Sequence, residues 1–237
     1  MNTMLDKAKI RTDVPLEIFQ TLDSTNDYLL HYARYDTQIC LAETQTAGRG
    51  REDRAWYSPL AENIYFSLRI PLKKFTGLSI ITSLAVIKTL KQFAPEAKFF
   101  AKWPNDIIYN NKKLAGCLIE IQHNTHAIIG IGLNVNMQHN LWASLKDITH
   151  ADMDRNEVCT VLIRTLADYI QEFEQKPFEN FIPEWNSVDY LAGKNITIQN
   201  KKGIMNGINK NGNLILELES GKIQEIFSGE ASTSLIK

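Results

Sequence analysis

The sequence predicts an α/β (α+β) fold in two parts: a larger domain with a mixed sheet over residues 1–190 and a small β domain over residues 191–237. In the larger part, short apolar runs of strand character alternate with two long stretches of helical periodicity. After residue 193 the apolar runs are short and separated by glycines, with a strong turn signal at Asn211-Gly212. An apolar content of 44% over 237 residues is ample for a core.

The first half of the larger domain begins with a polar segment without periodicity, residues 1–14, which we expect to be a loosely held lead-in. Asp23, Ser24 and Thr25 then precede helical spacing, so Ser24 or Thr25 is a candidate helix cap. Alternating apolar positions predict the strands. The predicted elements are a strand at 16–22, a helix ending near 33, and strands at 38–44 and 63–70.

The second half of this domain contains the two long helical patterns. The second of them begins with the spacing Asp154-x-x-Glu157, which resembles a capping box. Residues 141–152 have no clear period and predict a loop. The predicted elements are a helix at 77–93, a helix from 154 that ends near Pro177, a helix at 178–187, and strands at 98–102, 107–109, 114–122 and 127–135.

Charge and cysteine usage exclude several classes of protein. The net charge is -1, from 26 basic and 27 acidic side chains, so no global positive field favours DNA or an anionic membrane. The three cysteines, Cys40, Cys117 and Cys159, are widely spaced in apolar surroundings, which indicates reduced thiols and a cytoplasmic protein. Charges recur near the N-terminus, and no apolar run approaches the roughly 20 residues of a membrane span, so we expect neither a signal peptide nor an anchor.

Residues 46–56, TAGRGREDRAW, form the most distinctive segment of the chain, here called the arginine segment. It combines guanidinium groups, two glycines and an indole. Guanidinium groups bind phosphate or carboxylate in bidentate fashion, and glycine lets a ligand approach the backbone closely. The segment therefore predicts a site for an anion beside a flat base, although a solvated loop is the alternative because Glu52 and Asp53 lie within it.

A second segment, residues 101–120, contains KWPND and then KLAG on either side of an Asn-Asn turn. It places two lysines and one aspartate around a predicted hairpin. Other chemistries lack support: HExxH and GxSxG are absent, and GIGLNVN at residues 130–136 is an incomplete GxGxxG. The sequence therefore excludes a hydrolase, a zinc enzyme and a dinucleotide-binding dehydrogenase.

Taken together, GRGRxxRxW, KWPND with KLAG, DSTN at residues 23–26 and GIGLNVN closely resemble the biotin protein ligases in order and spacing. The resemblance implies a class II synthetase-like catalytic domain with a mixed sheet and a C-terminal SH3-like β domain. It also implies the reaction: biotin and ATP form biotinyl-adenylate, with Mg²⁺ as the metal, and biotin then passes to a lysine of the biotin carboxyl carrier protein of acetyl-CoA carboxylase. The nearest rivals that the resemblance leaves are lipoate ligases and octanoyl transferases, but GRGRxxRxW together with KWPND favours biotin.

The resemblance also implies roles for individual residues. Lys113 and Arg51 would be catalytic, at the meeting point of the biotin carboxylate and the α-phosphate. Ser24, Thr25 and Gln45 would face the ureido ring, and Trp56 would stack on adenine. The remaining expected binding residues, with no metal ligand among them, are Asn26, Gly48, Arg49, Gly50, Arg54, Lys102, Asp106, Gly116 and Asn134.

Some family members carry an N-terminal DNA-binding domain of about 60 residues. Here the first predicted strand begins near Leu16, so we expect a monofunctional ligase that binds no DNA. A homodimer formed through an edge strand and a nonenzymatic biotin-binding module stay open at this point.

Overall fold

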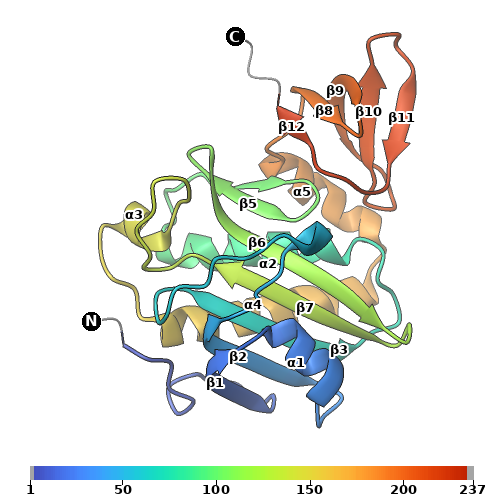
Figure 1. Cartoon of the computed structure of the whole chain (residues 1–237). Helices are drawn as coiled ribbons and strands as arrows, with labels where there is room; N and C mark the ends of the chain where they lie inside the picture. The colour runs from blue at the N-terminus through green and yellow to red at the C-terminus, as the bar shows by residue number, and fades with distance from the viewer. Residues whose placement is uncertain (1–2, 234–237) are drawn as a thin grey trace.

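A computed structural model describes residues 3–233 and contains two sheets (Figure 1). The large sheet has the order β1-β2-β3-β7-β6-β5-β4. Among the strands of residues 3–233, β1 with β2 is the parallel pair of this sheet and every other neighbouring pair is antiparallel, so the sheet is mixed as predicted. Its strands are β1 (Leu16–Leu22), β2 (Gln38–Gln45), β3 (Ile64–Pro71), β4 (Phe100–Lys102), β5 (Asp106–Tyr109), β6 (Lys112–Gln122) and β7 (His126–Leu133).

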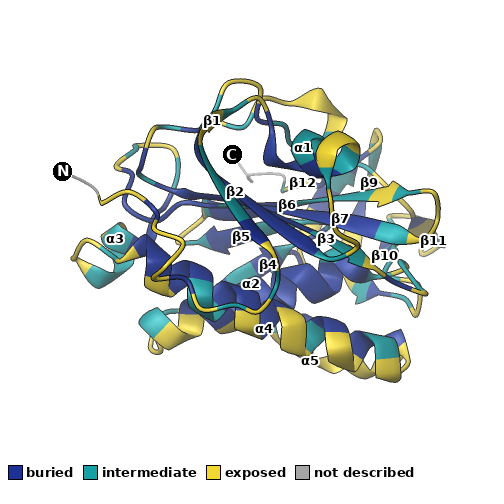
Figure 2. Ribbon diagram, turned by 90° about the horizontal axis from the view of Figure 1, so that it is seen from below, coloured by how far each residue is buried: buried dark blue, intermediate teal, exposed yellow. Residues whose placement is uncertain are grey.

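Helices cover both faces of this sheet (Figure 2). The long helices α2 (Leu78–Phe93) and α4 (Arg155–Gln175) lie on one face, and α1 (Thr25–Tyr32) lies on the other. The predicted apolar face of α4 is fully internal, because burying one stripe is how an amphipathic helix gains stability. Its buried members are Val158, Leu162, Leu166, Ile170 and Phe173.

Local signals explain how the helices begin. The Ser24 side chain caps α1 by accepting a hydrogen bond from the backbone N–H of Asp27. Of the two candidates Ser24 and Thr25, Ser24 is therefore the cap. Asp154 caps α4 through the N–H of Asn156, one residue nearer than the predicted capping box requires. The predicted helix at 178–187 is divided into a short 3-10 turn, η2 (Phe178–Phe181), and α5 (Ile182–Val188).

Two predictions about irregular segments were wrong. The expected loop at 141–152 contains a short helix, α3 (Leu145–Thr149), whose true capping box joins Ser144 and Asp147. The lead-in is not loosely held over its described part, because Leu5 and Ile10 are buried. Three backbone groups of this segment also bond to side chains of α4. Asp6 N–H donates to Asn156 Oδ1 at 2.8 Å, Arg11 N–H donates to Thr160 Oγ1 at 3.1 Å, and Thr3 O accepts from Arg155.

A second, antiparallel sheet has the order β11-β10-β9-β8-β12 and forms a separate C-terminal unit, as predicted (Figure 1). It is joined to the larger domain by a hydrogen bond of 3.0 Å from Trp103 Nε1 to Gly212 O. The boundary at residue 190 stays a prediction. The strands are β8 (Asn195–Ile198), β9 (Lys201–Ile208), β10 (Leu214–Leu218), β11 (Ile223–Ile226) and β12 (Ser232–Thr233).

No helix within residues 3–233 has the length and apolar content needed to cross a bilayer.

The lead-in is pinned by a buried ion pair. Arg155 and Glu43 lie 2.7 Å apart with side chains that are 1% and 2% exposed. The Arg155 guanidinium also donates to Asn63 O and Thr3 O, and Glu43 accepts from the backbone N–H of Leu5. Both charges are removed from water, so the loss of one would leave the other buried and unpaired in a low-dielectric site.

Replacing Arg155 with methionine should therefore lower the free energy of unfolding by about 3–5 kcal/mol, since Glu43 would stay buried without its partner. Urea denaturation measures this. The matched control is Lys176→Met, which breaks a half-exposed pair with Glu172 at 2.7 Å and should cost less than about 0.5 kcal/mol. A loss below about 1 kcal/mol for Arg155→Met would contradict the assigned role of the pair.

Candidate active site

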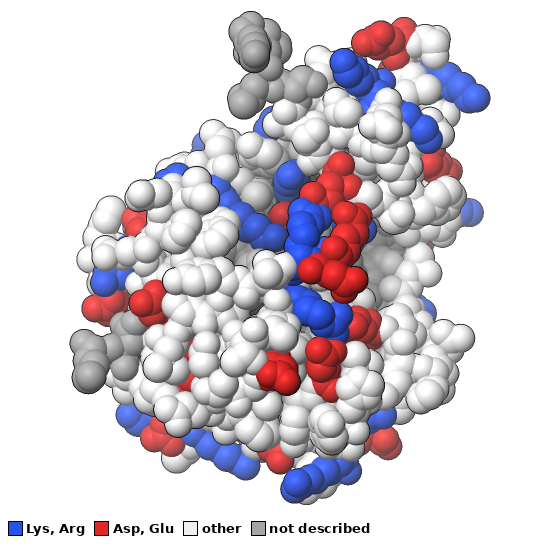
Figure 3. Space-filling model, viewed as in Figure 1, with Lys and Arg blue, Asp and Glu red and all other residues white. Residues whose placement is uncertain are grey.

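A cavity of about 400 Å³ opens where α1, the arginine segment and strands β5 to β7 meet. Figure 3 shows basic and acidic side chains side by side in the middle of this face. Of the 15 residues that the sequence singled out, all but Gly48 line the cavity. The lining members of that set are Ser24, Thr25, Asn26, Gln45, Arg49, Gly50, Arg51, Arg54, Trp56, Lys102, Asp106, Lys113, Gly116 and Asn134.

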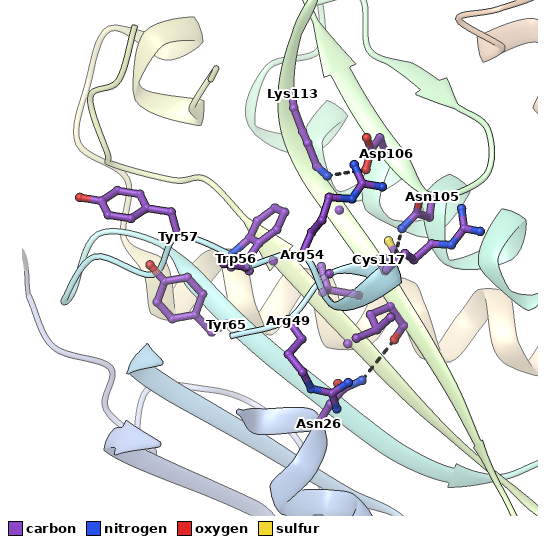
Figure 4. A pocket seen from close by; sticks show the side chains of 18 of the residues that line it. Asn26, Arg49, Arg54, Trp56, Tyr57, Tyr65, Asn105, Asp106, Lys113 and Cys117 are labelled. Atoms are coloured by element: carbon purple, nitrogen blue, oxygen red, sulfur yellow. Dashed lines mark hydrogen bonds and ion pairs between the residues drawn. The ribbon is translucent and has the colours of Figure 1, made fainter. Parts of the chain in front are cut away.

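Lys113 and Asp106 form an ion pair at the top of the cavity, with 2.6 Å between Nζ and Oδ1 (Figure 4). The β5–β6 hairpin brings them together. Its turn residues Asn110 and Asn111 both have positive φ, a conformation that asparagine adopts more readily than most residues. The Lys113 ammonium also lies 5.0 Å from the centre of the Trp56 ring, within range of a cation–π interaction.

The arginine segment is closed into a loop by its own backbone. Gly50 N–H donates to Arg54 O at 2.7 Å, and Trp56 N–H donates to Gly48 O at 2.8 Å. Between them, Glu52 and Asp53 both adopt positive φ in a single 3-10 turn, η1 (Arg51–Asp53). The three arginines of the loop all line the cavity, and Figure 4 shows Arg49 and Arg54 extending in different directions.

Two arginines of the loop contact the C-terminal domain. Arg51 Nη1 donates to Gly229 O at 3.2 Å, and Arg54 forms an ion pair with Glu230. Arg51 is half-buried, and this burial lowers its pKa from the ordinary value, while Glu52 and Asp106 act in the opposite direction. The cavity is therefore completed by a carboxylate that lies almost 180 residues along the chain from the loop.

Arg49 is placed differently from the other two arginines. Its side chain runs toward Asn26 (Figure 4) and pairs with two carboxylates, Asp27 on α1 and Glu120 on β6, the latter at 3.2 Å. The hydrogen bond and ion pair with Asp27, opposed by partial burial, raise its pKa. Arg49 therefore ties the base of the loop to α1 and β6.

A chain of hydrogen bonds lines the lower part of the cavity. Gln45 Oε1 accepts from the backbone N–H of Thr25 at 2.9 Å and lies 3.2 Å from its hydroxyl. Ser67 Oγ lies 2.7 Å from Thr25 Oγ1 and 2.6 Å from Asn26 Oδ1. Each group here is at most half-exposed, and Thr25, Asn26 and Ser67 are buried, so this part of the cavity can offer oriented donors and acceptors to a polar ring.

Glycines on β6 and β7 make room for the side chains that form the floor. A Cβ atom on Gly132 would lie 2.4 Å from the Trp56 ring, and one on Gly130 would lie 2.4 Å from Asn26 Oδ1. Gly48 has a related role outside the lining, because its Cβ would lie 2.8 Å from Gln45 Nε2. The indole N–H of Trp56 is buried beside Gly132 and has no hydrogen-bond partner among the described residues.

Lys102 and Asn134 also line the cavity, and their surroundings differ. Burial lowers the pKa of Lys102, opposed by Asp106, and Lys113 lowers it further. The Asn134 amide donates to Ala143 O at 3.0 Å and to Lys113 O at 3.4 Å. Asn134 therefore holds the Lys113 backbone next to the segment that carries Trp142.

Sequence reasoning missed several lining residues. Trp142 forms a cluster with His139, at 4.2 Å between ring centres, and with Tyr57, at 5.6 Å, and the rings of His139 and Tyr57 are 6.1 Å apart. It lies in the segment expected to be a featureless loop, and no local pattern marks it. The glycines at 130 and 132 could have been found, since alternate glycines on one strand leave one face of it open. Nothing in the sequence indicated Glu230.

Comparison with known proteins identifies the family. Residues 18–136 match the Biotin/lipoate A/B protein ligase family, and residues 193–233 match the Biotin protein ligase C terminal domain. The bifunctional ligase/repressor BirA of Escherichia coli strain K12 is 32% identical over 236 residues, which cover 91% of this chain and 73% of that protein. The chain belongs to the biotin/lipoate A/B protein ligase family.

Further relatives place this family member among the biotin protein ligases, and thus among enzymes. The biotin–acetyl-CoA-carboxylase ligase of Mycobacterium tuberculosis is 29% identical, over 91% of this chain and 87% of that protein. The structure of a biotin protein ligase from Aquifex aeolicus in complex with biotin and ATP aligns with a TM-score of 0.83 at 29% identity. It covers 92% of this chain and 97% of that one, so the agreement includes both sheets.

The close packing of Trp56 on Gly132 gives a stability prediction. Gly132→Ala should lower the free energy of unfolding by about 1–3 kcal/mol, because the new methyl group overpacks the floor of the cavity. Urea unfolding measures this. The control is Gly50→Ala, whose Cβ would meet nothing closer than 3.5 Å at an unstrained φ of -101°. Equal stabilities of the two variants would show that the indole does not lie where we describe it.

Proposed function

We propose that this cavity joins biotin to the AMP part of ATP, with release of pyrophosphate, and then passes biotin to a lysine of a biotin carboxyl carrier protein. One observation carries the proposal: Lys113, Arg51, Arg54 and Lys102 converge with an indole on a single cavity of about 400 Å³. The reaction must bring a carboxylate onto a phosphate, and two anions meet only where fixed cations already wait.

In the first step, an oxygen of the biotin carboxylate attacks the α-phosphorus of ATP. The bond from that phosphorus to the bridging oxygen breaks, and pyrophosphate leaves. Lys113 is proposed to lie at the meeting point, since its ammonium is held by Asp106 and stands over Trp56. Lys102 and Arg54 would balance the charge of the departing phosphates.

In the second step, the carrier amine attacks the carbonyl carbon of the adenylate, and AMP leaves with its phosphate. The adenylate must survive until the carrier arrives, and a closed cavity that excludes water protects it. We assign this retention to Arg51, which is half-buried and anchored to Gly229 O.

The two ends of the substrate have distinct surroundings. We place the ureido ring beside Ser24 and the hydrogen-bonded side chains of Thr25 and Gln45, where several polar groups face the cavity. Adenine is proposed to lie against the face of the Trp56 indole, which lines the cavity. Trp142, at the rim, offers a second flat surface.

Mg²⁺ is proposed to enter with ATP. Over residues 3–233, no three or more His, Cys, Asp or Glu side chains are grouped to hold a metal by themselves. Mg²⁺ needs little more than one or two carboxylates beside substrate phosphates, and the lining carboxylates Asp106 and Glu230 fit that requirement. When bound, the ion would withdraw charge from the phosphate oxygens.

Further parts of the proposal concern specificity and setting. The C-terminal match favours biotin over lipoate. The near-neutral net charge supports a ligase that binds no DNA, and three buried free cysteines support a cytoplasmic setting. We also propose that the protein forms a homodimer, which analytical ultracentrifugation would detect.

The direct test is incubation with labelled biotin, Mg-ATP and a biotin carboxyl carrier domain, with transfer followed on a gel. We expect label on the carrier and release of pyrophosphate that depends on biotin. Biotin binding without pyrophosphate release would instead indicate a nonenzymatic binding module.

Lys113→Ala should abolish adenylate formation and leave biotin affinity within a few-fold. The lost charge acts where the carboxylate and the α-phosphate converge, and such a loss costs about 3 kcal/mol or more of transition-state stabilisation. Pyrophosphate exchange and calorimetry measure the two quantities. Lys112→Ala, an exposed neighbour, is the control, and near-normal adenylation by the Lys113 variant would refute the assignment.

Arg51→Gly should release biotinyl-adenylate faster than it slows its formation. Removing one charge-assisted contact costs roughly 1.5–3 kcal/mol, so release could rise about tenfold to a hundredfold. The free adenylate acylates exposed amines, and serum albumin should become labelled in a mixture with biotin and ATP. Arg34→Gly, an exposed arginine outside the cavity, should label only the carrier. An Arg51 variant that makes adenylate but leaves albumin unlabelled would assign retention to another residue.

A further inference from the structure

Glu120 on β6 lies outside the cavity lining and has no role in the reaction as described above. Its two carboxylate oxygens have different partners. Oε2 accepts from Asn26 Nδ2 at 2.7 Å, and Oε1 accepts from Arg49 Nη2 at 3.2 Å. The side chain is 24% exposed, so the contacts are only partly screened by water.

The contact with Asn26 fixes the orientation of a buried amide. A carboxylate can only accept hydrogen bonds, and the second acceptor near the same nitrogen is Leu118 O at 3.4 Å. The Asn26 amide must therefore direct its NH₂ group to β6 and its oxygen to Ser67. Gly130 leaves the space that this orientation needs.

The amide orientation in turn fixes the proton of Ser67. With Asn26 Oδ1 at 2.6 Å, the single hydroxyl proton of Ser67 is donated to Asn26. The Thr25 hydroxyl, 2.7 Å from Ser67 Oγ and 3.2 Å from Gln45 Oε1, then has only acceptors among its neighbours in the protein. Its proton points into the protein, and a lone pair is left for the cavity.

We infer that Glu120 is a positioning residue that sets the direction of this hydrogen-bond chain, so that the Thr25 hydroxyl meets the ligand as an acceptor. The inference rests on the proposed function, in which the ligand group at Thr25 is a ureido N–H. Without the carboxylate, the Asn26 amide is free to turn over, and the protons of Ser67 and Thr25 can reverse. Thr25 would then offer a donor to a ligand group that is itself a donor.

Glu120→Gln tests the inference, because the substitution keeps the shape and lets the side chain donate to Asn26. The measurement is calorimetric affinity for biotin and for two analogues in which either ring N–H is replaced by oxygen. We expect the parent to discriminate against one analogue by more than tenfold, and Glu120→Gln by less than threefold. Turnover at saturating biotin should change less than the apparent affinity for biotin.

Two more variants separate the contacts of Glu120. Ser67→Ala cuts the chain between Asn26 and Thr25 and should also lose discrimination. Asp27→Asn weakens the other carboxylate contact of Arg49 and should keep the discrimination between the two analogues. The matched control is Glu217→Gln in the C-terminal domain, where a glutamate likewise accepts from an asparagine amide at 2.6 Å, on the surface.

Each outcome decides the matter. Full discrimination between the analogues by Glu120→Gln would overturn the inference. An equal loss of discrimination in Asp27→Asn would also overturn it, because Glu120 would then act through Arg49. If Glu120→Gln does not fold by circular dichroism, Ser67→Ala against Asp27→Asn gives the same decision. Failure of the parent to bind biotin would contradict the proposed function itself and is seen before any variant is compared.

Discussion

The site depends on one electrostatic constraint: several cations must stand close together before any anion arrives. Unpaired, they would repel one another in a partly buried cavity where charge interactions are stronger than in water. The protein meets this constraint with carboxylates from separate segments, pairing Lys113 with Asp106, Arg54 with Glu230, and Arg49 with Asp27 and Glu120. The cations are thus fixed in place by the protein, and the proposed phosphates would meet side chains that are already positioned.

Much of the site could be predicted from the sequence because most of its residues belong to short motifs. The spacing of KWPND and KLAG places Asp106 and Lys113 across one tight hairpin, where a register of a few residues determines their contact. The strands and long helices were predictable for a similar reason, since the periodicity of apolar residues reports directly on which face is buried. These are local properties, and each needs fewer than about 20 residues to recognise.

Contacts between distant segments could not be predicted in this way. The burial of Leu5 is determined by Glu43 and Arg155, and nothing within the lead-in shows that these partners exist. The same holds for Glu230, which reaches Arg54 only because the C-terminal sheet packs beside the loop. The helix at residues 145–149 is a different case, because the Ser144–Asp147 capping box was visible in the sequence but lay outside any apolar period.

The order of strands in the large sheet has a consequence for folding. Strands β4 to β7 follow one another as antiparallel neighbours with tight turns, so they can pair through local contacts. Strand β3 pairs with β7 across a much longer stretch of chain, as in Phe66 with Ile131, and such loop closures are slow. Lys113 and Gly130 belong to the local group, whereas Thr25 and the arginine segment lie in the part of the chain before β3, which joins the sheet through the pairing of β3 with β7. The cavity therefore straddles the early and late parts of the sheet, and we expect it to be among the last features to form as the chain folds.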